Sequence, residues 1–217
     1  MKWQYLSAVA LVATLGKPTT SDAQFVIYTN QSTFLAAITD PRVDAFSGFR
    51  TTSATASPIF RTAGAYGYTA SVSDVDGFFG AGSAENPSLS TNTPTDVVTF
   101  AGFTGGVGAI GGNFFGTSLD GAFASADIVV RYVDVTGSRS TTLMGPTAGS
   151  FFGVVSESRA ISSFTVSAVQ TGEENFLFPT VDNLTLAKTT VPEPATTALL
   201  ATGLLAIGFA ARRKRAL

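Results

Sequence analysis

Short apolar or alternating runs, separated by Gly, Ser, Asn and Pro, fill the sequence between Phe25 and Thr190. In the clearest run, Ile128, Val130 and Tyr132 fall on one face of an extended chain. This period of two, with turn residues at short intervals, predicts an all-β fold, an antiparallel β-sandwich. The expected strands are residues 25–28, 97–103, 110–115, 127–135, 151–155, 161–168 and 180–186.

Apolar residues at helical spacing are scarce in the same region. The best short helix covers residues 31–38, with Ser32 or Thr33 as its N-cap. Neither a repeat nor a charged or proline-rich linker divides the region, so we expect one domain at residues 24–190. A domain of about 165 residues buries most of the surface that its unfolded chain exposes, so a core of Phe, Val and Ile is sufficient.

Cysteine and histidine are both absent from the 217 residues. Their absence excludes disulfides, thiolate nucleophiles, zinc–cysteine sites and catalytic triads that use histidine. Residues 25–190 hold seven basic and thirteen acidic side chains, a net charge near −6. Nucleic acid is therefore not an expected partner, because binding it requires clustered Lys and Arg.

The N-terminal 23 residues have the layout of a secretory signal peptide. Lys2 precedes an apolar run at residues 6–15, and Ser21-Asp22-Ala23 provides a small-x-small cleavage pattern. The run is too short to span a bilayer, which takes about 20 residues. The alternative is an amphipathic first helix, but the run has no polar face.

The C-terminal 27 residues combine three elements in order. Val191-Pro192-Glu193-Pro194 precedes an uncharged apolar stretch, residues 195–211, which makes about 26 Å of helix against a hydrocarbon thickness of about 30 Å. A basic tail follows and is expected to stay cytoplasmic, which places the rest of the chain outside the membrane. The alternative is an ordinary tail anchor with a chance Pro-Glu-Pro. The tail consists of Arg212, Arg213, Lys214 and Arg215.

This order of elements resembles the PEP-CTERM sorting signal of Gram-negative bacteria. The resemblance implies recognition of Pro192, Glu193 and Pro194 by exosortase, a membrane-embedded protease of the inner membrane. It also implies cleavage around this motif, with delivery to the cell surface or the exopolysaccharide matrix. The precursor would be held briefly in the inner membrane by the helix at residues 195–211.

The central region resembles, more weakly, the passengers that travel with this signal. The similar segments follow one another in the order found in jelly-roll domains related to carbohydrate-binding modules. The resemblance implies a jelly-roll-like sandwich and does not identify a ligand. The segments are residues 108–115, 151–156, 161–166 and 180–186.

Three aspartates are candidate calcium ligands. Asp74-Val75-Asp76-Gly77 opens like many calcium loops but lacks the other ligands of an EF-hand, so a solvated loop is the alternative. Asp182 falls on the last expected strand, where it must point to solvent, bind an ion or pair with an arginine such as Arg131 or Arg159. No other cofactor is expected.

Two further patterns suggest chemistry that their context does not support. Residues 106–111 match the glycine-rich dinucleotide fingerprint, but no helix is expected after them, so we interpret these glycines as strand or turn positions beside large Phe side chains. Glu173 and Glu174 are adjacent, whereas a glycosidase needs two carboxyl groups about 5–9.5 Å apart across a cleft.

Two functional hypotheses follow. The first is a non-catalytic surface or matrix protein that contacts exopolysaccharide by stacking aromatic rings on sugars, and the second is an extracellular, carboxylate-dependent enzyme acting on glycans. The candidate rings are Tyr66, Tyr68, Phe78 and Phe79, for which packing inside the protein is the alternative role.

Overall fold

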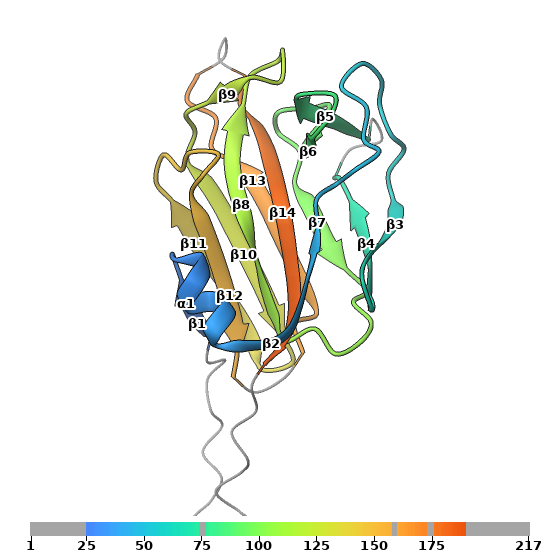
Figure 1. The fold of residues 1–217 in the computed structure, drawn as a ribbon. Coiled ribbons are helices and arrows are strands. Elements are labelled where there is room, and N and C mark those ends of the chain that lie inside the picture. The colour runs from blue at the N-terminus through green and yellow to red at the C-terminus, as the bar shows by residue number, and fades with distance from the viewer. Residues whose placement is uncertain (1–24, 74–76, 158–159, 173–175, 190–217) are drawn as a thin grey trace, which may run out of the picture.

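The computed structural model describes residues 25–73, 77–157, 160–172 and 176–189. These residues form two antiparallel sheets, of eight and six strands, that pack face to face (Figure 1). The first sheet contains, in spatial order, β1 (Phe25–Tyr28), β12 (Phe151–Ser156), β8 (Ala109–Thr117), β14 (Phe178–Thr189), β6 (Pro87–Thr91) and β5 (Phe78–Gly82), with β2 (Ile38–Asp44) beside β14 and β9 (Phe123–Ala124) beside β8. The second contains β11 (Gly137–Leu143), β10 (Ile128–Asp134), β13 (Ser163–Ala168), β7 (Val98–Ala101), β4 (Tyr66–Ser71) and β3 (Ile59–Ala63).

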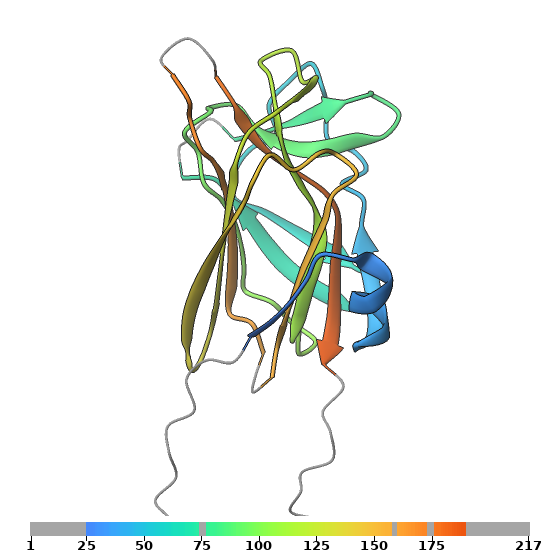
Figure 2. The ribbon, with the colours of Figure 1, turned by 90° about the vertical axis from the view of Figure 1, so that its left-hand side faces the viewer.

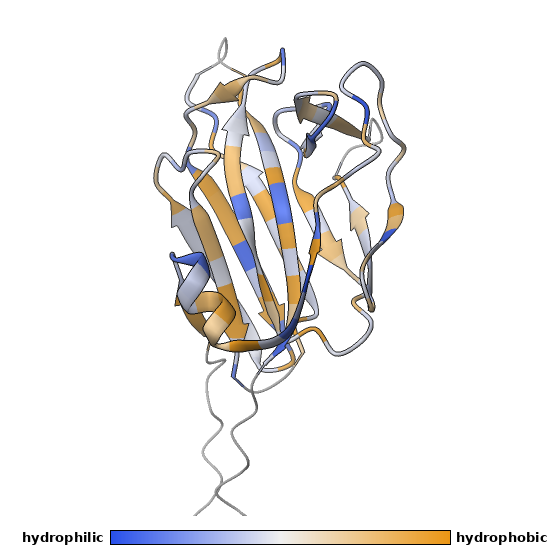
Figure 3. Cartoon of the chain, in the orientation of Figure 1, coloured by the Kyte–Doolittle hydropathy of each residue, from blue (hydrophilic) through white to orange (hydrophobic). Residues whose placement is uncertain are grey.

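Aromatic side chains from both sheets meet in the core. The rings of Phe114 on β8 and Phe164 on β13 lie 5.3 Å apart between centroids, and those of Tyr132 on β10 and Phe152 on β12 lie 6.4 Å apart. All four side chains are buried. Along β10, buried residues alternate with more exposed ones, and Figure 3 shows hydrophobic and hydrophilic bands following one another along several strands.

All seven strands expected from the sequence are present, with ends shifted by a few residues at most. The short helix is also present as α1 (Gln31–Ala36), but the predicted N-cap was wrong. The cap is Asn30, whose side-chain oxygen accepts hydrogen bonds from the N–H groups of Ser32 and Thr33. Asparagine satisfies the first free N–H groups as well as serine does, so the cap lies at residue 30 and the helix begins at Gln31, the predicted start.

The glycine-rich segment at residues 106–111 leads into β8, as interpreted above, and not into a helix. A Cβ atom on Gly111 would lie 2.7 Å from the ring of Phe151 and 3.0 Å from that of Phe34. The glycine therefore makes room for Phe34, the buried side chain by which α1 packs on the outer face of this sheet.

A buried ion pair joins the two sheets at one side of the sandwich. The Asp44 carboxylate, on β2, accepts hydrogen bonds from the Arg61 guanidinium on β3 at 2.6 and 2.7 Å and from the Tyr68 hydroxyl on β4 at 2.7 Å. Burial alone would raise the pKa of Asp44, but these bonds and one from the Phe46 N–H outweigh it and lower that pKa. The Arg61 guanidinium also lies 4.9 Å from the ring centre of Phe49.

A second carboxylate joins the sheets at the opposite side. Asp134, at the end of β10, accepts a hydrogen bond from the Ser156 hydroxyl on β12 at 2.7 Å. It also accepts bonds from the Thr136 N–H at 2.7 Å and the Gly137 N–H at 3.2 Å. Burial raises the pKa of Asp134, but the bonds from Thr136, Ser156 and Gly137 have the larger combined effect, so the net shift is downward.

The first and last described residues lie at the same end of the sandwich (Figures 1 and 2). Phe25 pairs with Ser156, whose N–H donates to the Gly108 carbonyl at 2.9 Å, and the Gly108 N–H donates to the Ala187 carbonyl at 2.9 Å. The described residues include no helix that is long and apolar enough to cross a membrane. The helix expected at residues 195–211 lies outside the described residues.

Replacing Arg61 with Ala should destabilise the domain by about 3–5 kcal/mol, because it leaves the buried Asp44 carboxylate without its counter-ion. Arg42→Ala is the matched control, since the Arg42–Asp40 pair is exposed, with 53% and 40% of its side-chain surfaces accessible. The control should cost less than about 1 kcal/mol. Urea denaturation measures both values, and equal losses would contradict a special role for the Asp44–Arg61 pair.

Candidate functional site

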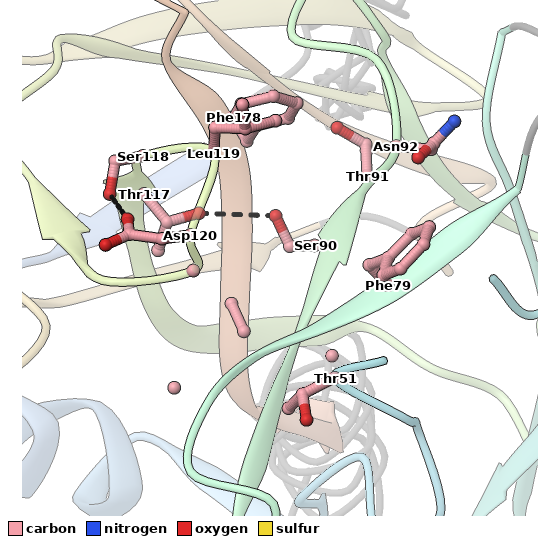
Figure 4. Close-up of a pocket in the computed structure, with 14 residues that line it drawn as sticks. Thr51, Phe79, Ser90, Thr91, Asn92, Thr117, Ser118, Leu119, Asp120 and Phe178 are labelled. Atoms are coloured by element: carbon pink, nitrogen blue, oxygen red, sulfur yellow. Dashed lines mark hydrogen bonds between the residues drawn. The ribbon is translucent and has the colours of Figure 1, made fainter. Parts of the chain in front are cut away.

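A hollow of about 250 Å³ opens at the end of the sandwich that lies away from Phe25 and Thr189. The β5–β6 hairpin and the turn between β8 and β9 form its walls, and Phe178 at the start of β14 closes one side (Figure 4). The lining combines the aromatic residues Phe79 and Phe178 with hydroxyl, amide and carboxylate groups. The polar side chains are Thr51, Ser90, Thr91, Asn92, Thr117, Ser118 and Asp120.

Three buried hydroxyl groups lie together beneath this hollow. The Thr117 hydroxyl on β8 is hydrogen-bonded to that of Thr180 on β14 at 2.8 Å, and the Thr180 hydroxyl donates to Ser90 on β6 at 3.0 Å. Ser90 and Thr117 are also within 3.4 Å of each other and face the hollow (Figure 4). The cluster therefore fixes the floor of the hollow with polar groups that already have partners.

The Asp120 carboxylate is held at the rim by the turn between β8 and β9. It accepts hydrogen bonds from the Ser118 hydroxyl and from the Ala122 N–H at 3.4 Å. The Ser118 bond, then the Ala122 bond, lowers the pKa of Asp120, so the group is ionised at neutral pH. Gly121 permits this turn because its φ is +77°. The Gly121 carbonyl accepts a 3.0 Å bond from the Gly82 N–H, which ties the turn to the β5–β6 hairpin.

These groups suit an uncharged ligand that carries many hydroxyl groups. A carboxylate accepts hydrogen bonds from hydroxyl groups, and the Asn92 amide both donates and accepts them. The Phe79 ring lies on the outward side of β5, half-buried, and supplies an apolar face for the C–H groups of such a ligand (Figure 4). A few polar groups beside an aromatic wall are typical of small-molecule sites.

Three of the four rings named as candidates for stacking on sugars are inaccessible. Tyr66, Tyr68 and Phe78 are buried in the core, where their rings or hydroxyl groups contact other side chains. The alternative role, packing inside the protein, is confirmed for these three. On β5, alternation turns Phe78 inward and its neighbour Phe79 outward. Phe79 alone among the four lines the hollow.

Asp182 lies on β14, the last strand, as the sequence predicted, but it does not pair with Arg131. Arg131 belongs to the other sheet, and its guanidinium donates to the Ser138 hydroxyl at 3.1 Å. The Asp182 carboxylate instead accepts hydrogen bonds from the backbone N–H and side-chain amide of Asn183, at 2.8 and 3.1 Å. Burial raises the pKa of Asp182, against a smaller lowering by the Asn183 N–H.

Comparison with known protein families gives one finding, at the C-terminus. A family model described as the PEP-CTERM protein-sorting motif matches residues 190–215. The chain carries a PEP-CTERM sorting motif. The motif implies an exported protein that an exosortase processes and that is sorted to the surface. No curated protein and no solved structure matches the chain.

Several predicted residues lie outside the described part of the chain. They include the PEP-CTERM residues Val191 to Pro194 and the basic tail from Arg212 to Arg215. The same holds for Asp74, Asp76, Arg159, Glu173 and Glu174. Within the described residues no three His, Cys, Asp or Glu side chains are grouped as metal ligands would be.

One buried carboxylate, Asp96, was not predicted from the sequence. Its Oδ1 atom accepts a 3.0 Å hydrogen bond from the hydroxyl of Ser73, the residue that precedes Asp74. The polar lining of the hollow was not predicted either. The one local signal there was the Ser118–Gly121 turn, whose residue types favour turns but indicate no ligand.

Replacing Asp182 with Asn should leave stability at pH 7 within about 1 kcal/mol of wild type or above it. The pKa of Asp182 in the folded protein lies above the unfolded value of 3.8. The contribution of this carboxyl group to folding stability is therefore fully present below pH 3.8 and is lost as the pH rises through the folded pKa. An asparagine at position 182 does not ionise, so the variant does not lose this stability as the pH rises. Thermal denaturation at pH 3 and pH 7 measures the effect.

Asp134→Asn is the matched control, and it should lower stability at pH 7 by about 1–3 kcal/mol because the Asp134 pKa is shifted downward. A large loss of stability at pH 7 in Asp182→Asn would instead indicate that the carboxylate is stabilised by a cation.

Proposed function

We propose that this protein is a non-catalytic component of the cell surface or extracellular matrix that binds uncharged exopolysaccharide. The observation that carries this proposal is the hollow at the end of the sandwich, where Phe79, Asn92 and Asp120 surround a floor of hydroxyl groups. Export through the PEP-CTERM motif brings such a domain to the place where exopolysaccharide occurs. The jelly-roll-like sandwich implied by the resemblance is a fold that binds carbohydrates in other proteins.

The chemistry of the hollow favours binding over hydrolysis. A glycosidase needs two carboxyl groups on either side of the scissile bond, one of them with a raised pKa. Asp120 is the carboxylate among the described lining residues, and its pKa is shifted downward. Asp120 is therefore suited to accept hydrogen bonds and unsuited to act as a general acid at neutral pH.

The proposed path of the protein combines both chain ends. Residues 1–23 serve as a signal peptide, and residues 195–211 span the inner membrane of a Gram-negative bacterium with the basic tail in the cytoplasm. Exosortase then recognises Pro192, Glu193 and Pro194. Its action delivers residues 24–190 to the surface or the matrix.

Asp120→Ala should weaken binding of the host's neutral exopolysaccharide about 10- to 100-fold, because it removes charge-assisted hydrogen bonds. Phe79→Ala should weaken it about tenfold through loss of the apolar face. Isothermal titration calorimetry on the exported domain measures both. Glu85→Ala and Phe60→Ala are controls of the same chemical change at exposed positions outside the hollow, and their affinities should match wild type. Unchanged affinity in Asp120→Ala and Phe79→Ala would contradict the site.

A glycan-active enzyme is the alternative function. Incubating the wild-type protein with the same exopolysaccharide and measuring new reducing ends separates the two. The binding proposal predicts no increase over buffer, whereas release of oligosaccharides that is lost in Glu173→Gln or Glu174→Gln would establish the enzyme.

We propose calcium as a structural ion of the loop at Asp74 and Asp76, with the neighbouring Asp96 as a further oxygen ligand. Calcium should then raise the melting temperature of the wild-type domain over its value in EDTA. The double variant Asp74→Asn, Asp76→Asn should lose this increase, while Asp182→Asn should keep part or all of it. No calcium effect on the wild type would exclude the site.

Replacing Pro192, Glu193 and Pro194 with Ala should block processing, because the substitutions remove the motif that exosortase recognises. Immunoblots of membrane, surface and medium fractions from the native host should show the full-length precursor accumulating in the membrane. Thr189→Ala is the control and should be processed as wild type. Normal size and delivery of the triple variant would contradict sorting by this motif.

A further inference from the structure

A second hollow, of about 650 Å³, lies beside the start of α1, where the edge strands β1 of the first sheet and β11 of the second both contribute residues. Residues of β1, β8, β11 and β12 line it together with the Thr29–Gln31 turn. The lining carries amides and hydroxyl groups, such as Gln31, Asn113 and Thr141, next to the apolar side chains of Ile27 and Met144. None of these described lining residues is charged. The second hollow is thus suited, like the first, to an uncharged polar ligand.

Strand β8 connects the two hollows. Asn113 lines the second hollow and Thr117 the first, and both side chains lie on the outward face of β8 because they are four residues apart. The register is regular between them, since Asn113 pairs with Asp182 and Thr117 with Phe178 on β14. Four residues of extended strand span about 13 Å. The two hollows therefore share strand β8, and the residues of β8 that line them are separated by a distance that a chain-like ligand can bridge.

An accessible aromatic ring lies beside β8, close to the segment between Asn113 and Thr117. Phe123 on β9 pairs with Thr117, and its ring lies 6.4 Å from that of Phe115, the outward residue between Asn113 and Thr117. Half of the Phe123 side chain, 50%, is exposed. It supplies an apolar surface where a ligand passing from one hollow to the other would cross.

The polar groups at the second hollow are held in position before any ligand binds. The Asn113 side-chain amide donates to the Ser150 carbonyl at 3.0 Å, and its oxygen accepts from the Asn183 amide at 3.3 Å. Asp182 in turn accepts from Asn183. Fixed groups lower the entropic cost of binding. The charge on this face is negative, from Asp120 at one hollow and Asp182 near the other, which disfavours an acidic polymer.

We propose that the two hollows are subsites of one binding track along β8, which takes an extended, uncharged polysaccharide chain across the Phe123 ring. This proposal rests on the function proposed for the first hollow and specifies its ligand as a chain long enough to occupy both. A short oligosaccharide fills the first hollow alone, whereas a longer one gains the contacts of Phe123, Gln31 and Asn113.

The test uses the neutral exopolysaccharide of the host's culture, fractionated into a ladder from disaccharides to polymer, with affinities measured by calorimetry. Affinity should rise about tenfold or more once the chain is long enough to reach both hollows, because the second contact becomes intramolecular. Gln31→Ala and Phe123→Ala should remove most of this gain and leave the affinity of the shortest binding oligosaccharide unchanged. Gln31 is exposed and lies outside the core, so this variant should fold normally.

Phe60→Ala, at an exposed ring on the other sheet, is the control and should retain the gain with length. Affinity that is independent of chain length, combined with loss of binding in Asp120→Ala, would overturn the track and leave the first hollow as the site. Absence of binding by any fraction would overturn both proposals.

Discussion

The sandwich depends on two carboxylates that join its sheets from opposite sides. Asp44 reaches Arg61 and Tyr68 across one side, and Asp134 reaches Ser156 across the other. A buried carboxylate is costly unless it is fully hydrogen-bonded, so each requires its partners to be correctly placed. Because the partners belong to different strands of the facing sheet, satisfying the two groups also fixes how the sheets lie on each other. The chain has no cysteine, so these two links help to hold the sheets together, a role that disulfides have in other exported domains.

The fold class and seven strands could be predicted because their residues alternate or form apolar runs between turns. Three of the strands that escaped prediction, β5, β6 and β11, lack such a pattern. β11 is mostly Gly, Ser, Thr and Arg at the edge of a sheet, and β5 and β6 are short hairpin strands rich in Gly, Ser and Pro. Such strands form because they pair with a neighbouring strand, and their local sequence alone does not predict them.

The candidate site was less predictable than the fold, because segments far apart in the sequence form it. Ser90, Thr117 and Thr180 come from three strands and carry no motif, yet their hydroxyl groups share one hydrogen-bonded cluster. Phe79 could be named from the sequence, but its neighbour Phe78 could not be distinguished from it until the register of β5 was known. The sorting motif, in contrast, could be predicted from the sequence, because its residues are contiguous.

The position of the two ends of the domain has a mechanical consequence. Phe25 and Ala187 are joined through Ser156 and Gly108 at one pole, and β8 runs from there to the opposite pole over about 27 Å. A chain cut beyond Thr189 would therefore lose material only at the base. The surface at the far pole would be the same in a cell-attached form and in a released form. Release would therefore change the location of the domain and leave its ligand-binding surface unchanged.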